Sequence, residues 1–283
     1  MFKLRDSAVK AAKGLTRRVI NSAGYDLSRK RSPSRLLAPP ITDTRGTILE
    51  FVGPSGIGKS TLCAEFYAAI GKNWFSKEDL DDLILQDLDY PEDLQKDLNE
   101  LLLRKAIRHC NADDLWVAAG KLKYASFILE KDLLMRRVFS RGFIIDEGLF
   151  HNFSRDIIKL SPDSLRRLAS GRALVFVEAS SGKTVAERYM ERYRQRSARG
   201  FKHPTSFQQV EEESDSYLST FRSLYQAVSK ICPCLRINVE DGFEENLRQV
   251  KAFEAGLKER MKKGSFDLGQ SHQTAAKATL RAS

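Results

Sequence analysis

A glycine-rich segment that ends in a lysine and a serine has the residue types needed to bind phosphate. Residues 53–60 read GPSGIGKS and match the pattern GxxxxGK[ST] in full. Glycines let backbone N–H groups turn inward around phosphate oxygens, the lysine adds a positive charge, and the serine hydroxyl can bind Mg²⁺. The sequence therefore predicts a site for a nucleoside triphosphate and Mg²⁺. Its residues are Gly53, Pro54, Ser55, Gly56, Ile57, Gly58, Lys59, Ser60 and Thr61.

A phosphate-binding loop of this kind lies between a buried strand and a helix. Residues 47–52, TILEFV, are short and largely apolar, which predicts the strand. Residues 61–70 then predict the helix. This context separates a true phosphate-binding loop from a chance match to the pattern.

A pair of acids follows a second apolar segment. Residues 142–146, GFIID, predict a buried strand that ends in Asp146, with Glu147 and Gly148 directly after it. A carboxylate at the end of a strand beside the P-loop strand can hold Mg²⁺ directly or through water. We therefore expect Ser60 and Asp146 to bind the metal, and Glu147 to orient a water or to take a proton from an acceptor hydroxyl.

Arginines are dense in a third segment, which begins soon after the apolar residues 173–178. They occupy positions 188, 192, 194, 196 and 199 of a predicted helix, and four of them share one face at i, i+4, i+8 and i+11. Like charges on one helical face repel each other unless an anion lies between them. A mobile lid can bring such cations to a transferring phosphoryl group. The alternative is a solvated helix whose charges are offset by Glu187 and Glu191.

The remaining pattern predicts the fold class. Residues 235–239 indicate another short strand, residues 72–90 should contain one more, and residues 91–139 are helical. Short apolar strands separated by long helical stretches predict an α/β fold with a parallel sheet covered on both faces. We expect residues 1–45 to form a basic amphipathic helix and linker, residues 46–260 the catalytic domain, and residues 261–283 a disordered tail.

This order of motifs resembles the P-loop nucleoside and nucleotide kinases, thymidylate-kinase-like members in particular. The resemblance covers about residues 46–252 and implies a five-stranded parallel sheet in the order 2-3-1-4-5. It implies that the chain transfers the γ-phosphate of ATP, with Mg²⁺, to a nucleoside, nucleotide or sugar-type acceptor. It also implies that Lys59 and Ser60 serve the nucleotide and the metal, and that Asp146 lies at the acceptor side. By the same likeness, the catalytic lid residues are Arg192, Arg194 and Arg196.

The chain departs from that family at the acceptor side. Thymidylate and deoxynucleoside kinases commonly carry Asp-Arg where this sequence has Asp146-Glu147, and that arginine helps to hold the acceptor. The departure argues against a nucleotide acceptor. Residues 24–27, GYDL, are similar to the leader of some bacterial surface-polysaccharide enzymes, which keeps a sugar or glycan-precursor acceptor open. His151 either lines the acceptor pocket or is an ordinary satisfied histidine.

Positive charge is concentrated at the N-terminus. The 283 residues carry a net charge of +10, and residues 1–40 account for +8 of it, with ten Lys or Arg against two Asp. The nearly neutral body does not argue for nucleic acid. Residues 1–35 could contact anionic membrane, act as a transit peptide, or dock on the body as a solvated helix. The four cysteines form no disulfide framework, and we expect a cytoplasmic protein. The sequence does not decide whether the chain forms a homodimer.

The sequence is compatible with three functions: a small-molecule kinase, an NTPase that couples hydrolysis to a conformational change, and a nucleotide-binding regulatory module. The loop and the IIDE segment also resemble transporter ATPases. Those ATPases carry an LSGGQ-like signature before the acidic pair, and residues 133–141 read LLMRRVFSR instead. The arginine-rich helix has no role in such an ATPase, so the sequence favours the kinase.

Overall fold

The structure, a computed structural model, describes residues 47–71, 74–76, 91–110, 115–136, 142–197 and 206–262. The predictions made for residues 1–45 and for the tail from residue 263 lie outside these ranges. The strands are β1 (Ile48–Val52), β2 (Trp74–Phe75), β3 (Gly142–Asp146), β4 (Arg172–Glu178) and β5 (Cys234–Asn238). The helices are α3 (Lys59–Ile70), α4 (Glu92–Cys110), α5 (Leu115–Arg136), α6 (Leu149–Asn152), α7 (Ser154–Ile157), α8 (Pro162–Ala169), α9 (Gly182–Ser197), α10 (Phe207–Val228) and α11 (Phe243–Lys262), with a 3-10 turn η3 (Val239–Asp241) before the last of them.

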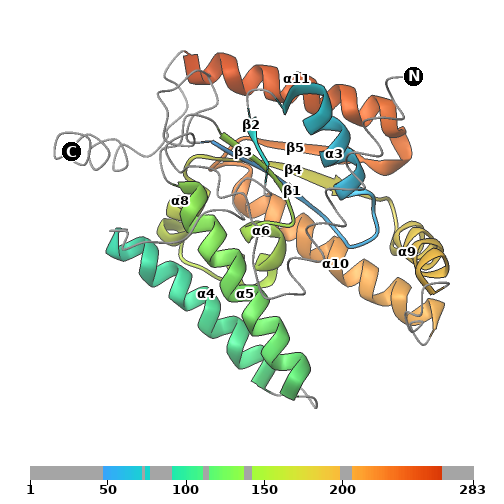
Figure 1. Cartoon of the computed structure of the whole chain (residues 1–283), viewed down its shortest axis with the longest axis horizontal. Coiled ribbons are helices and arrows are strands. Elements are labelled where there is room, and N and C mark those ends of the chain that lie inside the picture. The colour runs from blue at the N-terminus through green and yellow to red at the C-terminus, as the bar shows by residue number, and fades with distance from the viewer. Residues whose placement is uncertain are drawn as a thin grey trace, which may run out of the picture. The chain divides into compact units, whose positions relative to one another are not determined.

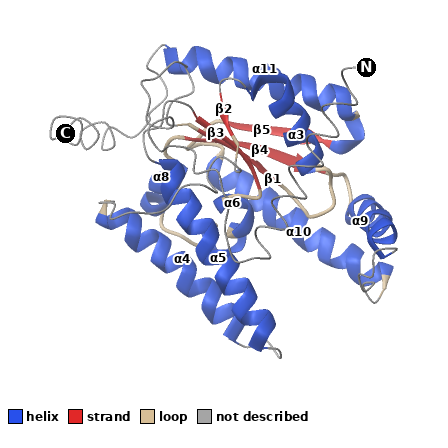
Figure 2. Ribbon diagram, in the orientation of Figure 1, coloured by secondary structure: helices blue, strands red, loops and turns tan. Residues whose placement is uncertain are grey.

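The five strands form one parallel sheet in the order β2-β3-β1-β4-β5 (Figure 2). This order confirms the predicted α/β fold. The strand expected within residues 72–90 is β2, and its Trp74 is buried and donates an indole N–H to Glu254 of α11 at 2.8 Å. Strand β1, which leads into the phosphate-binding loop, lies at the centre of the sheet between β3 and β4. The carboxyl ends of these three strands therefore meet at one edge.

Helices cover both faces of the sheet (Figure 1). On one face α3 and α11 pack on alternate strand residues such as Val175 and Val177. The other face is covered by α4, α5, α6, α8 and α10. These helices pack on the strand residues that alternate with the first set, including Leu174 and Phe176. Every residue of β1 and β4 is buried, and both strands are mainly apolar in sequence, with Glu50, Arg172 and Glu178 as their charged residues.

Four buried charged side chains connect the centre of the sheet to α5 and α8. Arg172 of β4 pairs with Glu50 of β1 and with Asp132 of α5, and none of the three is exposed to solvent. Asp132 also accepts a hydrogen bond from Arg136 at 2.5 Å, and Arg136 donates to the carbonyl of Leu168 at 2.7 Å. Burial raises the pKa of Glu50 to about 7 against the opposing charge of Arg172. Burial alone would raise the pKa of Asp132, but Arg136 and Arg172 hold it below its ordinary value.

Two pairs of helices pack side by side. Helices α4 and α5 pack against each other, and so do α9 and α10 (Figure 1). Helix α9 begins where the backbone N–H of Gly182 donates to Asp215 of α10 at 2.7 Å. A Cβ atom at this glycine would lie 2.5 Å from that carboxylate, so the close contact requires glycine. None of the helices in the described ranges is both long and apolar enough to cross a bilayer.

Candidate active site

The glycine-rich loop connects the end of β1 to the start of α3, as the motif predicts. Gly53 has a φ of 150°, and a Cβ atom there would lie 2.2 Å from the carbonyl oxygen of Val177 in β4. Gly58 directly precedes α3 with a φ of 104°, in the left-handed region that favours glycine. The backbone at these two positions therefore needs glycine for space and for conformation. Ser60 and Thr61, in the first turn of α3, are exposed to solvent.

Lys59 lies inside the loop. Its side chain is 3% exposed and donates to the carbonyl of Pro54 at 2.7 Å. Burial lowers its pKa to about 8, the carboxylates of Glu147 and Asp146 oppose that shift, and Arg192 adds to it. The Nζ atom lies 3.8 Å from an Oε atom of Glu147. The loop lysine, the acidic pair and one arginine of α9 thus act on each other electrostatically.

The acidic pair stands where β3 ends. Asp146 is in register with Phe51 of β1, so it lies next to the start of the glycine-rich loop. Glu147 has a φ of 56°, which costs a residue other than glycine about 1–3 kcal/mol. Its carbonyl accepts from Asn152 Nδ2 at 2.5 Å, and its amide donates to the carbonyl of Phe51 at 3.4 Å. The turn is held by its backbone, and the Glu147 side chain remains partly exposed beside Lys59.

The residues near the loop fit a magnesium ion. Mg²⁺ prefers oxygen ligands and usually takes one or two from the protein, with substrate phosphates and water completing its shell. The hydroxyl of Ser60 and the carboxylate of Asp146 supply oxygens of this kind. Within the ranges that the structure describes, no three His, Cys, Asp or Glu side chains gather into a protein-only metal centre. The donor set therefore matches a metal held jointly with a bound nucleotide.

Helix α9 approaches the loop through its first three turns. Arg188 donates to the carbonyl of Ile57 at 3.3 Å and to that of Val239 at 3.5 Å. Tyr189 packs closely on Gly56 and contacts the ring of Tyr193 in a tilted arrangement, with ring centroids 5.3 Å apart. Arg188 thereby connects the glycine-rich loop to the turn that follows β5.

The three predicted lid arginines have different positions. Arg192 is close enough to Lys59 to affect its pKa. Arg194 contacts Glu191 at 3.2 Å on the same helix, and its side chain is 70% exposed. The side chain of Arg196 lies outside the described part of the chain. Of the described arginines on this helix, Arg188 and Arg192 are therefore the ones that the structure places near the loop.

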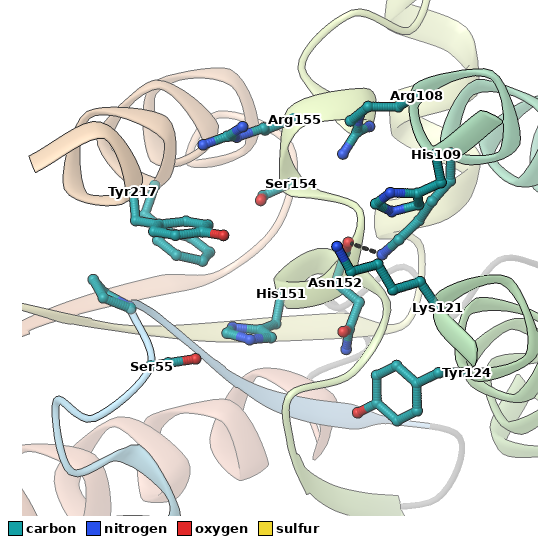
Figure 3. A pocket seen from close by; sticks show the side chains of 13 residues that line it. Ser55, Arg108, His109, Lys121, Tyr124, His151, Asn152, Ser154, Arg155 and Tyr217 are labelled. Atoms are coloured by element: carbon teal, nitrogen blue, oxygen red, sulfur yellow. Dashed lines mark hydrogen bonds between the residues drawn. The ribbon is translucent and has the colours of Figure 1, made fainter. Parts of the chain in front are cut away.

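A pocket of about 430 Å³ opens beside the loop (Figure 3). It is lined by residues of the loop, α4, α5, the α6–α7 segment and α10. These residues are Pro54, Ser55, Lys105, Arg108, His109, Lys121, Tyr124, His151, Asn152, Ser154, Arg155, Tyr217 and Phe221. The volume is that of a site for a small molecule. Among the described residues that line it there is neither Asp nor Glu, whereas four are Lys or Arg.

His151 forms the floor of the pocket between the loop and α10. Its ring stacks on Phe221, with centroids 5.5 Å apart and planes inclined by 17°. Its backbone N–H donates to the buried Glu50 at 2.9 Å. Burial and the charges of Lys59 and Lys105 hold the pKa of His151 well below its ordinary value, so the ring is neutral at pH 7. Of the two interpretations open for this histidine, the structure favours the pocket.

The pocket cations on α4 and α5 were not predicted. Residues 91–139 were interpreted as core-forming helices because leucines and isoleucines recur at helical spacing. Lys105, Arg108 and His109 share one turn of α4, but Lys121 comes from the next helix. The sequence carries no signal for how those two helices pair, so the cluster could be found only in three dimensions. The sequence did indicate Arg188, since it is one of the four arginines predicted to share one helical face.

No protein-family model matches the sequence, and no curated protein matches it. The chain is similar to a solved gluconokinase from Sinorhizobium meliloti 1021, with 20% identity and a TM-score of 0.38 over 78% of this chain and 99% of that one. It is also similar to a deoxyadenosine kinase from M. mycoides, with 14% identity and a TM-score of 0.42 over 75% of this chain and 100% of that one. At these identities and TM-scores the likenesses name neither a substrate nor a reaction for this chain.

Proposed function

We propose that this protein is a kinase that transfers the γ-phosphate of ATP to a small molecule bound in the pocket of Figure 3. The observation that carries the proposal is the shared wall between two sites. Pro54 and Ser55 belong to the phosphate-binding loop and also line the pocket. A molecule in the pocket therefore lies next to the phosphates of a nucleotide in the loop, as direct phosphoryl transfer requires.

Each charged residue of the loop region then has a role in the transfer. Lys59 holds the β- and γ-phosphates, and the backbone N–H groups of the loop bind their oxygens. Ser60 and Asp146 would hold Mg²⁺, which would offset charge on the phosphates. Arg188 and Arg192 supply positive charge from α9. These groups stabilise charge that develops on the phosphoryl oxygens as the bond to ADP breaks.

We infer that Glu147 acts on the acceptor, because its carboxylate lies 4.0 Å from Nε2 of His151, which lines the pocket. A hydroxyl oxygen of the acceptor forms the new bond to phosphorus, the bond from phosphorus to the β-phosphate oxygen breaks, and ADP leaves with the electron pair. The hydroxyl proton goes to the Glu147 carboxylate. The side chain of Glu147 is 37% exposed and lies beside Lys59, and the residue follows the strand next to the loop. A carboxylate in this position serves as a general base.

The test follows the γ-phosphate of labelled ATP with Mg²⁺ and a pool of nucleosides, nucleotides, sugars and sugar phosphates. We expect label on an acceptor with the natural chain. Lys59→Ala should reduce the rate by at least about 10²-fold, because it removes a positive charge from the transferring phosphate. Circular dichroism and the thermal midpoint of each chain establish that the variant is folded.

Two results would contradict the kinase. Label released as free phosphate at the same rate with and without acceptors would indicate an NTPase. Label that stays in ATP with every acceptor class would leave a nucleotide-binding module. Unchanged transfer by a folded Lys59→Ala chain would instead contradict the assignment of the loop.

A further inference from the structure

The pocket beside the loop carries a second cluster of cations, distinct from the loop and from α9. It consists of Lys105 and Arg108 on α4 and Lys121 on α5 (hereafter the α4–α5 cluster). In Figure 3 Arg108 and Lys121 lie on the side of the pocket away from Ser55, and His151 lies between that side and Ser55. The cluster therefore lies across the pocket from Ser55 of the phosphate-binding loop.

The α4–α5 cluster is only partly neutralised by the protein. Arg108 pairs with Asp156 of α7, a buried carboxylate whose Oδ2 atom has no hydrogen-bond partner in the described structure. Lys105 donates to the carbonyl of Asn152 at 2.7 Å and lies over the ring of Phe153. Lys121 has no ion-pair partner among the described residues. Three cations against one carboxylate leave two positive charges uncompensated in the cluster.

Such a cluster costs free energy unless an anion occupies it. Burial lowers the pKa of Lys105 to about 8, and the like charges of Arg108 and Lys121 add to that shift. A dianion bound between these side chains would remove the repulsion and accept hydrogen bonds from all three. A phosphomonoester carries close to two negative charges near neutral pH and has three acceptor oxygens.

We propose, on the basis of the kinase function above, that the acceptor carries a phosphomonoester bound by the α4–α5 cluster and receives the γ-phosphate on a hydroxyl at its other end. The separation of the cluster from Ser55 sets this orientation (Figure 3). The phosphomonoester acts as an anchor and is not itself phosphorylated. A phosphorylated sugar or polyol fits this description, and its product is a bisphosphate with two separate ester groups.

The binding test uses inorganic phosphate as the probe. The full chain, with its loop filled by AMP-PNP and Mg²⁺, is titrated with phosphate and followed by ³¹P NMR. We expect saturable binding that Lys121→Glu weakens by about tenfold or more, because it reverses one charge of three. Lys123→Glu is the matched control: it reverses an exposed charge on the same helix outside the pocket lining, and should leave the affinity unchanged.

Absence of saturable binding, or equal loss in both variants, would overturn the anion site. Tighter binding of malonate than of phosphate would overturn the assignment to a phosphomonoester. In the transfer assay, label should appear on a hydroxyl of phosphorylated acceptors, which ³¹P NMR of the product shows as a second monoester. A diphosphate product, or equal transfer to the matching neutral sugars, would contradict the anchor.

The experiments can contradict the kinase and the anion site independently of each other. A chain that binds phosphate in the cluster but transfers label to no acceptor would contradict the kinase and leave the anion site in place. A chain that phosphorylates neutral acceptors and binds no phosphate would contradict the anion site and leave the kinase in place.

Discussion

Glu147 occupies an unusual backbone conformation directly beside the loop lysine. Its φ of 56° is a position that glycine or asparagine would adopt more easily, yet the chain places a glutamate there. Its backbone bonds to Phe51 and Asn152 hold the turn while the carboxylate points toward Lys59. Strain retained at such a position suggests a requirement for the side chain.

We expect Glu147→Gln to reduce kcat for phosphoryl transfer by about 10²–10⁴-fold, because the amide cannot take the hydroxyl proton. The KM for ATP should change little, since the loop and Lys59 remain. Steady-state kinetics with an acceptor identified by the labelled-ATP assay measures both constants. Glu191→Gln, on the exposed side of α9, is the control and should retain full activity. A kcat for Glu147→Gln within threefold of the natural chain would rule out the base.

Lys105 gives the anion site a pH dependence. Burial and the charges of Arg108 and Lys121 lower its pKa to about 8, whereas the carboxylate of Asp156 opposes the shift. Lys105 is therefore a cation below about pH 8 and becomes neutral above it. Sulfate keeps the same charge over this range, so any change in its affinity comes from the protein.

We expect the Kd of sulfate, measured with AMP-PNP and Mg²⁺ bound, to rise as the pH increases from about 7 to about 9.5. Lys105→Gln should bind sulfate weakly at both ends of this range, because it lacks the titrating charge. Isothermal titration calorimetry measures both chains. A natural chain whose sulfate affinity stays constant across the range would show that Lys105 does not contribute to the site.

At the scale of elements, helix α9 directs its arginines to different sides of the helix. Arg188 and Arg192 lie toward the loop, whereas Arg194 contacts Glu191 and is largely exposed. Two residues along a helix correspond to a rotation of about 200°, so Arg192 and Arg194 face nearly opposite directions. Only one of the two therefore faces a bound nucleotide.

This difference predicts unequal effects of the same substitution. We expect Arg192→Ala to lower kcat by about 10–10³-fold, because it removes a cation that stabilises the transferring phosphoryl group. Arg194→Ala, on the same helix and of the same size, should change kcat by less than about twofold. The comparison is made in one transfer assay at saturating ATP. Equal loss in the two variants would mean that α9 acts through its total charge and not through position.

At the scale of the whole molecule, the buried network around Arg172 joins the sheet to the helices that form the pocket. Arg172 contacts Glu50 on the central strand and Asp132 on α5, and Glu50 accepts the N–H of His151 on the pocket floor. The sheet, α5 and the pocket are therefore coupled through one guanidinium group. Removing it would leave Glu50 buried without its cation and Asp132 with Arg136 as its remaining partner.

We expect Arg172→Met to lower the free energy of unfolding by about 3–5 kcal/mol, the usual cost of breaking a buried ion pair from one side. Urea denaturation followed by circular dichroism measures it. Arg166→Met removes an arginine from an exposed pair with Asp163 on α8 and should leave the urea midpoint unchanged. An Arg172→Met chain as stable as the natural one would show that the network contributes nothing net to the fold.

The sequence by itself determined the local parts of this protein. Four strands and the glycine-rich loop were predicted within a residue or two, and the arginine-dense helix was predicted without exact bounds. Each depends on a short-range pattern: an apolar run, a fixed spacing of glycines, or a charged helical face. The strand order was predicted only through resemblance to a family, and the structure confirms it. The shortest strand, β2, could be assigned only to a range, because two residues carry too little pattern.

The tertiary structure alone decided which distant residues share a site. Lys105, Lys121 and His151 belong to three helices, and no sequence pattern records how α4 and α5 pair or that α6 lies beneath them. The same holds for Arg172 and Glu50, which read as polar interruptions of two strands until parallel pairing brings them together. Helical and strand periodicity arises from backbone geometry over a few residues, whereas a pocket depends on the packing of whole elements.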